Sequence, residues 1–330
     1  MINIYSLLKI NRFIKNPTLK KLAIWILHVS GRRYLAVFLD PVLACNLRCR
    51  MCYFSNEEKR KTMKGLFTEE DLPRIAEVIF PRALKLQIGC GAEPSLFKHN
   101  AEIVRLGRQY GVPYISYTTN ANLLTPEEID KLLAAGLNEF TISLHGVKKH
   151  TYEDLMQGAF YDRFMSALND ISAAKNRFPD FKLRINFTVN EQNIEELSGF
   201  FDAFGDMKID ILQVRPVQNM DGEIKTIENQ TAFNALFEKV TLYLKNECTK
   251  RGITYIAPLH LDKNPKINKN SGIIEATYWY ISPRTFGSGV DWRNETFQQY
   301  CKRTHYATYL FKSIFLKKQF LEDKLNYEIV

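Results

Sequence analysis

The sequence predicts an α/β fold, in which six βα units build a parallel sheet that suits a partial (β/α)6 TIM-like barrel with a C-terminal α+β cap. Two observations carry this prediction: apolar runs alternate with helical patterns, and successive units have similar lengths. Six apolar runs are predicted as strands, at 34–42, 83–89, 112–118, 138–144, 182–189 and 209–215. The helical patterns lie between them, at 68–79, 98–109, 126–135, 160–177 and 193–204.

Helix boundaries carry local signals. Thr68-Glu69-Glu70-Asp71 and Thr125-Pro126-Glu127-Glu128 each place a hydroxyl before acids, as expected for a capped first helical turn. Gly111 and Gly136 fall where helix C-caps belong. These signals support the helices predicted before and after them.

The chain divides into three predicted segments. Residues 1–33 form a basic amphipathic helical segment, 34–220 the barrel, and 221–330 a cap or substrate-binding region. Within the last segment the βα pattern weakens. A long helix is predicted near 228–250 and a strand at 253–257.

Composition excludes several classes of protein. The chain has 330 residues, of which 45% are hydrophobic and 25% charged, which is ordinary for a soluble globular protein. No apolar run approaches the length of a membrane span, and no repeat or signal peptide is evident. Cys90, Cys248 and Cys301 are scattered without a disulfide pattern. We therefore expect a reducing, cytoplasmic location.

The positive charge is concentrated at the N-terminus. The net charge is +9, and residues 1–39 hold seven Lys and Arg without one Asp or Glu. Apolar residues and Trp25 are interleaved with these cations, as in a helix lying on an anionic membrane surface. The alternative is a helix packed on the barrel with its lysines solvated. A nucleic-acid partner is not expected, because the charge is confined to one end.

The most specific feature is a cluster of three cysteines. Cys45, Cys49 and Cys52 follow the first predicted strand with C-x3-C-x2-C spacing. Three thiolates on one short loop can hold three corners of an iron–sulfur cluster and leave the fourth iron open for another ligand. A zinc site usually needs a second Cys/His pair, and no such pair follows. A zinc-stabilised interaction protein is therefore the weaker alternative.

These cysteines and four further motifs resemble the radical S-adenosylmethionine (radical SAM) enzymes. The resemblance covers about residues 34–217, and the four motifs follow the second to fifth predicted strands in the order of that family. They are Gly91-Ala92-Glu93-Pro94, Thr119-Asn120-Ala121, Ile142-Ser143-Leu144-His145-Gly146 and Arg184-Ile185-Asn186-Phe187-Thr188-Val189. Ala92 and Ala121 stand where the family usually has Gly, and Met51 where it usually has an aromatic residue.

The resemblance implies a cofactor pair and a site. Cys45, Cys49 and Cys52 would hold a [4Fe–4S] cluster, and S-adenosylmethionine (SAM) would chelate its open iron. The residues implied in SAM binding are Met51, Gly91, Ala92, Glu93, Thr119, Asn120, Ser143 and Asn186. A small electron donor such as flavodoxin or ferredoxin would reduce the cluster. The motifs lie at the C-terminal ends of strands, where parallel α/β barrels place their chemistry.

The sixth predicted strand carries two polar residues on one face, Gln213 and Arg215. If they point into the barrel, they contact substrate or SAM, and Arg215 can bind a carboxylate or phosphate bidentately. Only Cys248 and Cys301 follow residue 220, too few for an auxiliary cluster. We therefore expect a single-cluster radical SAM enzyme acting on an unidentified substrate, with lipid-linked and peptide substrates as candidates. The alternative is an iron–sulfur electron-transfer or sensing protein that does not consume SAM.

Overall fold

The computed structural model describes most of the chain, and every structural statement refers to that part. The described residues are 14, 16–218, 220, 222–224, 227–258, 261, 267–268, 271–287, 289–316, 320–321 and 327–329.

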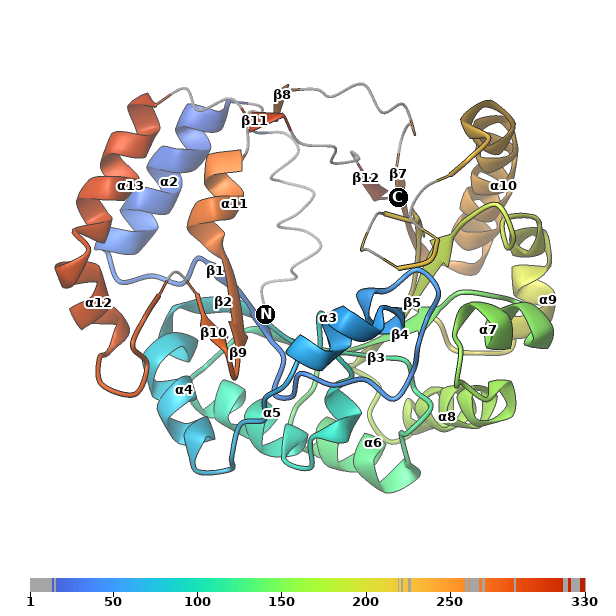
Figure 1. Ribbon diagram of the computed structural model, residues 1–330, viewed down its shortest axis with the longest axis horizontal. Helices are drawn as coiled ribbons and strands as arrows, with labels where there is room; N and C mark the ends of the chain where they lie inside the picture. The colour runs from blue at the N-terminus through green and yellow to red at the C-terminus, as the bar shows by residue number, and fades with distance from the viewer. Residues whose placement is uncertain are drawn as a thin grey trace.

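A curved, ten-stranded sheet forms the centre of the molecule (Figure 1). Its order is β10-β9-β1-β2-β3-β4-β5-β6-β7-β12, and all neighbours from β9 to β7 are parallel. The strands are β1 (Leu35–Leu39), β2 (Ala83–Ile88), β3 (Tyr114–Thr119), β4 (Glu139–Leu144), β5 (Lys182–Val189), β6 (Ile211–Pro216), β7 (Thr254–Pro258), β9 (Tyr278–Ser282), β10 (Thr285–Phe286) and β12 (Tyr327–Ile329). A separate pair joins β8 (Ile267–Asn268) to β11 (Phe320–Leu321).

The predicted partial barrel is confirmed. Across the described residues the sheet stays open, with the antiparallel strands β10 and β12 at its two edges. All six predicted core strands are present, with boundaries within a few residues of the predicted ones. The predicted strand at 253–257 is β7, and the predicted long helix is α10 (Gln230–Arg251).

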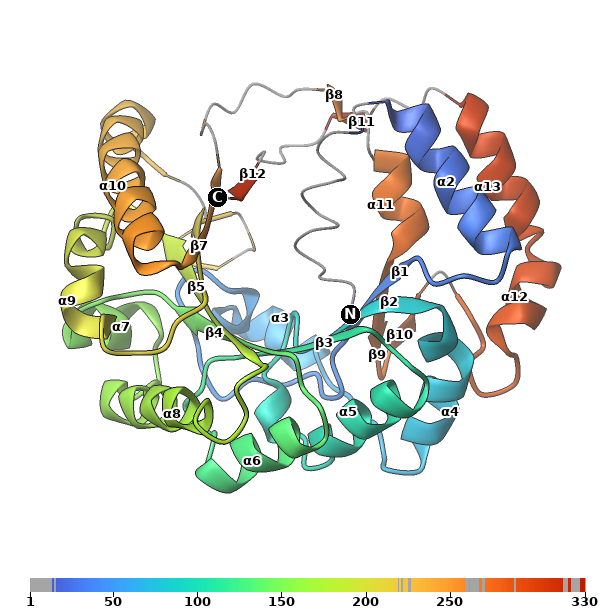
Figure 2. The same cartoon turned by 180° about the vertical axis from the view of Figure 1, so that it is seen from behind.

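Helices cover the convex face of the sheet (Figure 2). They are α4 (Asp71–Ile79), α5 (Asn100–Gln109), α6 (Pro126–Ala134), α8 (Tyr161–Ala174) and α9 (Phe200–Phe204). Alternate strand residues face this layer. Leu86 and Ile115, for example, pack against Gly107 of α5. A Cβ atom at that glycine would lie only 2.7 Å from the Ile115 Cδ1 atom. The opposite, concave face carries polar side chains such as Lys85, Arg184 and Gln213, together with the stacked rings of Phe38 and Tyr278.

Local signals explain the helix ends. α6 begins with a full capping box between Thr125 and Glu128. Gly111 and Gly136 have φ of 70° and 102°, which confirms their predicted place after helices. The first signal acts differently from the prediction, because the Asp71 carboxylate accepts from the Thr68 amide at 3.0 Å and the helix starts only at 71.

Some elements were not predicted. The helix expected over 193–204 is a short 3₁₀ segment, η4 (Glu195–Gly199), followed by α9. The additional helices are α3 (Glu57–Thr62), α7 (Lys149–Leu155), α11 (Ser271–Thr277), α12 (Phe297–Arg303) and α13 (Tyr306–Phe315). Further 3₁₀ segments are η1 (Tyr53–Ser55), η2 (Phe80–Arg82) and η3 (Pro94–Leu96). β9 is the most consequential addition, because it extends the sheet beside β1.

The N-terminal segment contains α2 (Pro17–Val29), which packs against α13 and α11. The helix expected in 1–33 is present over 17–29, but it packs mainly on helices of the C-terminal region rather than on the barrel. Residues 1–13 and 15 lie outside the described part. The expected solvated lysines are not seen, because Lys20 and Lys21 are half-buried. The Lys21 ammonium donates to the carbonyls of Ser313 and Leu316 at 2.8 and 3.0 Å. No described helix is long and apolar enough to cross a bilayer.

Candidate active site

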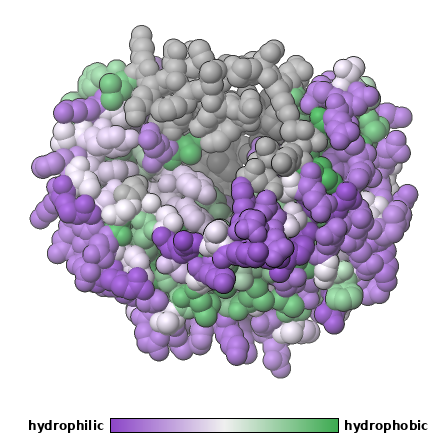
Figure 3. Space-filling view, in the orientation of Figure 1, coloured by the Kyte–Doolittle hydropathy of each residue, from purple (hydrophilic) through white to green (hydrophobic). Residues whose placement is uncertain are grey.

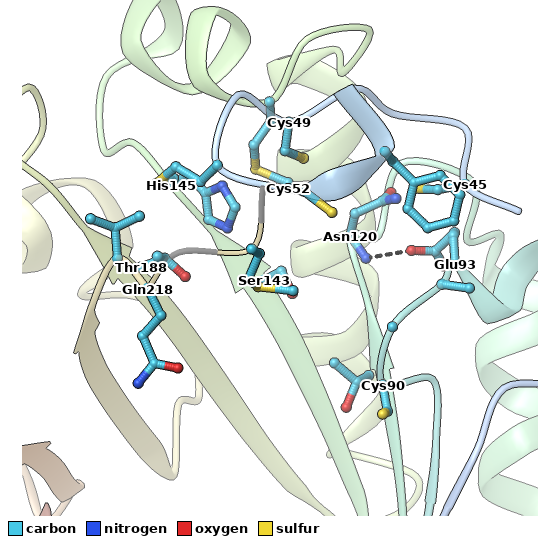
Figure 4. Close-up of a pocket in the computed structure, with 18 of the residues that line it drawn as sticks. Cys45, Cys49, Cys52, Cys90, Glu93, Asn120, Ser143, His145, Thr188 and Gln218 are labelled. Carbon is cyan, nitrogen blue, oxygen red and sulfur yellow. Dashed lines mark hydrogen bonds between the residues drawn. The ribbon is translucent and has the colours of Figure 1, made fainter. Parts of the chain in front are cut away.

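The three motif cysteines line one pocket above the C-terminal ends of the strands (Figure 4). Their loop follows β1 and is tied to the segment after α7. The amides of Arg48 and Arg50 donate to the carbonyls of Gln157 and Leu155 at 2.8 and 3.0 Å. The Arg50 guanidinium also pairs with Asp154 at 2.7 Å. The backbone of this loop is therefore held while its thiols face the pocket.

The thiols need a positive partner to ionise. Burial raises the pKa of Cys45 to about 12, and the nearby Glu93 carboxylate adds to the shift. Burial also raises the pKa of Cys49, and its proximity to Cys45 and Cys52 raises it further. A coordinated metal removes this penalty, because it binds the thiolate directly. These thiols are therefore protonated unless a metal ion binds them.

The arrangement differs from that of a single-ion site. Within the described residues, no three His, Cys, Asp or Glu side chains converge on a point where one ion could be held. Each cysteine of an iron–sulfur cluster binds a different iron, so its ligands need not converge. The spread of Cys45, Cys49 and Cys52 around one pocket is consistent with that larger group.

The loop after β2 is fastened to three neighbouring elements. Asp40, at the end of β1, accepts from the amides of Cys90 and Gly91 at 2.7 and 2.9 Å and from the Tyr280 hydroxyl at 2.8 Å. The Tyr53 hydroxyl donates to the carbonyl of Gly91. This carbonyl and its neighbours therefore have a fixed direction at the edge of the pocket.

Glu93 links this loop to β3. Its carboxylate is 3% exposed and accepts from the Thr119 hydroxyl at 2.6 Å and from the Asn120 amide at 2.9 Å. The Asn120 side chain in turn donates to Asn46 in the cysteine loop at 2.9 Å. Burial raises the pKa of Glu93, while these hydrogen bonds oppose the shift. A buried acid in such a network is suited to bind a cationic ligand group.

The structure brings most of the predicted site residues together. Eight of those predicted beside the cysteines line the pocket: Met51, Gly91, Ala92, Glu93, Thr119, Asn120, Ser143 and Arg215. Asn186 and Gln213 do not line it. Asn186 is buried on β5, and its side-chain oxygen has no hydrogen-bond partner among the described atoms. Gln213 accepts from Arg184 on the concave face.

The departures from the family motif have local explanations. Ala121 has φ of 63°, so it adopts the left-handed conformation that glycine takes more easily. Ala92 has no such strain, since its φ is negative. Met51 is buried, and its sulfur accepts from the Asn190 amide group at 3.4 Å. A thioether therefore replaces the usual aromatic side chain without leaving the pocket wall.

Other lining residues were not predicted. His145, Cys90, Thr188 and Gln218 also face the pocket (Figure 4). Burial, and to a smaller extent the charge of Arg215, lower the pKa of His145 to about 3, so its imidazole is neutral. The motif Ser143-Leu144-His145 contained a signal for this residue, because alternate positions on a strand share a face.

Comparison with known proteins identifies the fold family. The model of the radical SAM superfamily matches residues 40–203. The chain belongs to the radical SAM superfamily. It is 32% identical over 177 residues to a probable GTP 3′,8-cyclase of Saccharolobus solfataricus, covering 53% of this chain and 55% of that protein. It is 29% identical over 160 residues to an AdoMet-dependent heme synthase of Methanosarcina barkeri, covering 48% and 43%. The chain thus spans about half the length of these relatives.

Two solved structures share the fold. Streptococcus suis SuiB bound to S-adenosylmethionine has a TM-score of 0.60 at 19% identity, over 76% of this chain and 59% of that one. Native anSMEcpe with bound AdoMet has a TM-score of 0.53 at 16% identity, over 66% and 62%. Family membership supports SAM and an iron–sulfur cluster as the cofactors.

Proposed function

We propose that this protein is a radical SAM enzyme with a [4Fe–4S] cluster held by Cys45, Cys49 and Cys52. The observation that carries the proposal is one pocket in which three cysteines face the Glu93 network. The chemistry that such a cluster and SAM supply together is reductive cleavage of the sulfonium C–S bond, giving methionine and a 5′-deoxyadenosyl radical. That radical abstracts hydrogen from, or adds to, the substrate.

The chain's own residues would bind and orient SAM. Backbone carbonyls near Gly91 and the carboxylate of Glu93 can accept from the ammonium of its methionine part. Thr119, Asn120 and Ser143 offer short polar groups at neighbouring strand ends, which suit ribose hydroxyls and the methionine carboxylate. Met51 lines the same pocket as an apolar contact for adenine.

We place the substrate over the concave face of β4 to β6. Arg215 lines the pocket, and Gln213 lies one pleat deeper beside Arg184. Asn186 stays a proposed SAM contact, because its unpartnered buried oxygen faces the same side as Arg184. This polar surface suits a substrate with charged or hydrogen-bonding groups. The named reactions of the relatives do not identify that substrate, since the chain spans only about half of each.

A reductant must reach the cluster, and we propose a small electron donor such as flavodoxin or ferredoxin. The predicted membrane contact of residues 1–33 also stays a proposal, and its structural basis is a surface that α2 shares with α13.

The deciding experiment is anaerobic turnover. The protein is reconstituted with iron and sulfide, dithionite and SAM are added, and 5′-deoxyadenosine is quantified. We expect its formation in the unmodified protein and its loss in Cys49→Ala. Cys248→Ala is the matched control, because that buried thiol lies on α10, outside the pocket. A protein that binds a cluster yet never cleaves SAM would favour electron transfer or sensing, and a colourless zinc protein would contradict both.

A further inference from the structure

The outward face of α2 is apolar. Among its thirteen residues, those exposed include no charged side chain, although the helix contains two lysines. The large exposed side chains repeat at i, i+3, i+7 and i+10, which aligns them on one side of a helix. They are Leu19, Leu22, Ile26 and Val29, with 55%, 37%, 49% and 53% of their surface exposed. The core-facing side of the helix is apolar as well, with Ile24 buried and Leu27 packed against the core, so α2 is apolar on two sides.

The lysines of α2 point the other way. Lys21 reaches the C-terminal carbonyls of α13, where a cation complements the helix dipole. Lys20 is half-buried, and burial lowers the pKa of its ammonium. The bonds of Lys21 and the buried Ile24 therefore fix the rotation of the helix, and the opposite apolar face is left toward solvent.

α13 extends the same apolar surface. Trp25 of α2 contacts Phe311 with ring centroids 5.3 Å apart, and Phe311 contacts Phe315 at 5.4 Å. Phe315 is 72% exposed and Leu316 beside it 51%. Figure 3 shows apolar side chains gathered at the upper left, over the adjoining ends of α2 and α13. We call this continuous area the α2–α13 surface.

The two stretches of sequence that build this surface contain basic residues and no acidic ones. Residues 1–39 contain seven Lys and Arg, and 296–321 contain five, with no Asp or Glu in either. The other 265 residues hold the remaining 33 Lys and Arg against all 36 acids. α11, which also borders α13, adds one acid, Glu275, beside Tyr309. Arg303 pairs with Glu295 at 2.5 Å, whereas Lys312, next to Phe311 on α13, is exposed. An apolar surface built from two stretches of net positive charge is complementary to a bilayer surface with anionic headgroups.

We propose that the α2–α13 surface docks the protein on an anionic membrane, with its aliphatic and aromatic side chains inserted at the headgroup level. This goes beyond the predicted contact of residues 1–33, because half of the surface comes from the C-terminal helix α13. The contact is peripheral and does not depend on the radical chemistry.

The test is binding of the reconstituted full-length protein to vesicles. Sedimentation with phosphatidylcholine vesicles is compared with sedimentation with vesicles that also contain phosphatidylglycerol, at low and high salt. We expect at least tenfold stronger binding to the anionic vesicles, weakened by salt. Ile26→Ser combined with Phe315→Ser is expected to weaken that binding at least tenfold. Leu242→Ser is the matched control, because this leucine is 61% exposed on α10 and should have no effect.

Two readouts keep the result specific. Formation of 5′-deoxyadenosine in solution is expected to be unchanged in the double variant, so failure of the docking proposal is distinguishable from failure of the proposed activity. Absence of vesicle binding, or binding that the double variant retains, would overturn the proposal. A dimer of the unmodified protein in sedimentation velocity, lost in the double variant, would also overturn it, because a second copy would then cover the surface.

Discussion

Replacing Gly91 with alanine tests how tightly Tyr53 and Asp40 pack against the loop after β2. A Cβ atom at this position would lie 2.6 Å from the Tyr53 hydroxyl oxygen and 3.2 Å from the Asp40 carboxylate. The second contact is tight but tolerable, whereas the first requires movement. Because Tyr53 also bonds the Gly91 carbonyl and Asp40 bonds its amide, the loop has little freedom to move. We expect a loss of about 1–3 kcal/mol in the free energy of unfolding, the usual cost of overpacking.

The same geometry predicts a rescue. Tyr53→Phe removes the oxygen that the new methyl group would meet, and the nearest remaining ring atom lies 3.8 Å away, an ordinary contact. Alone, this substitution loses the hydrogen bond to the Gly91 carbonyl, which costs roughly 0.5–1.5 kcal/mol. The double variant should then be about as stable as Tyr53→Phe, so the coupling between the two sites should be about 1–3 kcal/mol.

The assay is urea unfolding of the four proteins in one anaerobic buffer, together with SAM titration by calorimetry. SAM binding should weaken in Gly91→Ala and recover in the double variant. Each 1.4 kcal/mol of binding free energy that is lost raises the Kd for SAM about tenfold. Additive stability losses, or an alanine variant as stable as the unmodified protein, would refute the placement of Tyr53 against this loop.

Three further substitutions test other parts of the structure. Glu93→Gln should weaken SAM binding at least tenfold in calorimetry. Ser95→Ala, which removes one of several hydrogen bonds to the same carboxylate and keeps its charge, should change it less than threefold. Gly89→Ala should cost at least about 3 kcal/mol in urea unfolding, because φ is +78° and its Cβ would meet backbone; Gly252→Ala, with φ of +69° and open space, should cost about 1–2 kcal/mol. Burial lowers the pKa of His28 to about 4, so the folded protein resists protonation there. Stability should therefore fall as pH drops from about 6.5 toward 4, and His28→Gln should flatten this decline in acid unfolding.

The barrel core could be predicted because its signals are local. Each of the six strands is an apolar run beside a helical pattern, and the cysteine motif lies within eight residues. The polar motifs at the strand ends also required only the rule that parallel strands present their C-terminal ends on one rim. The confirmed elements are those whose evidence lies within a short window of sequence.

β9 and Asp40 could not be predicted, because their evidence is distant in sequence. Tyr278-Trp279-Tyr280-Ile281-Ser282 is a plausible strand, but nothing in it specifies a partner about 240 residues earlier. Asp40 lies within the first predicted strand, directly after the observed β1, and its function appears only when the amides of Cys90 and Gly91 approach it from the loop after β2. Gln213 and Arg215 share one face of β6, but only Arg215, nearer the C-terminal end of the strand, lines the pocket. Strand alternation predicts the shared face and does not reveal this difference in depth.

The C-terminal region forms part of the wall beside the site. α11 continues directly into β9, and β9 carries the Tyr280 hydroxyl to Asp40. Asp40 in turn holds the amide of Gly91 at the pocket. Because α11 also packs on α2, the α2–α13 surface and the Gly91 loop are joined by an unbroken sequence of packed elements. The docking proposed for that surface requires helices that are fixed relative to the pocket, and this connection through β9 supplies that fixed geometry.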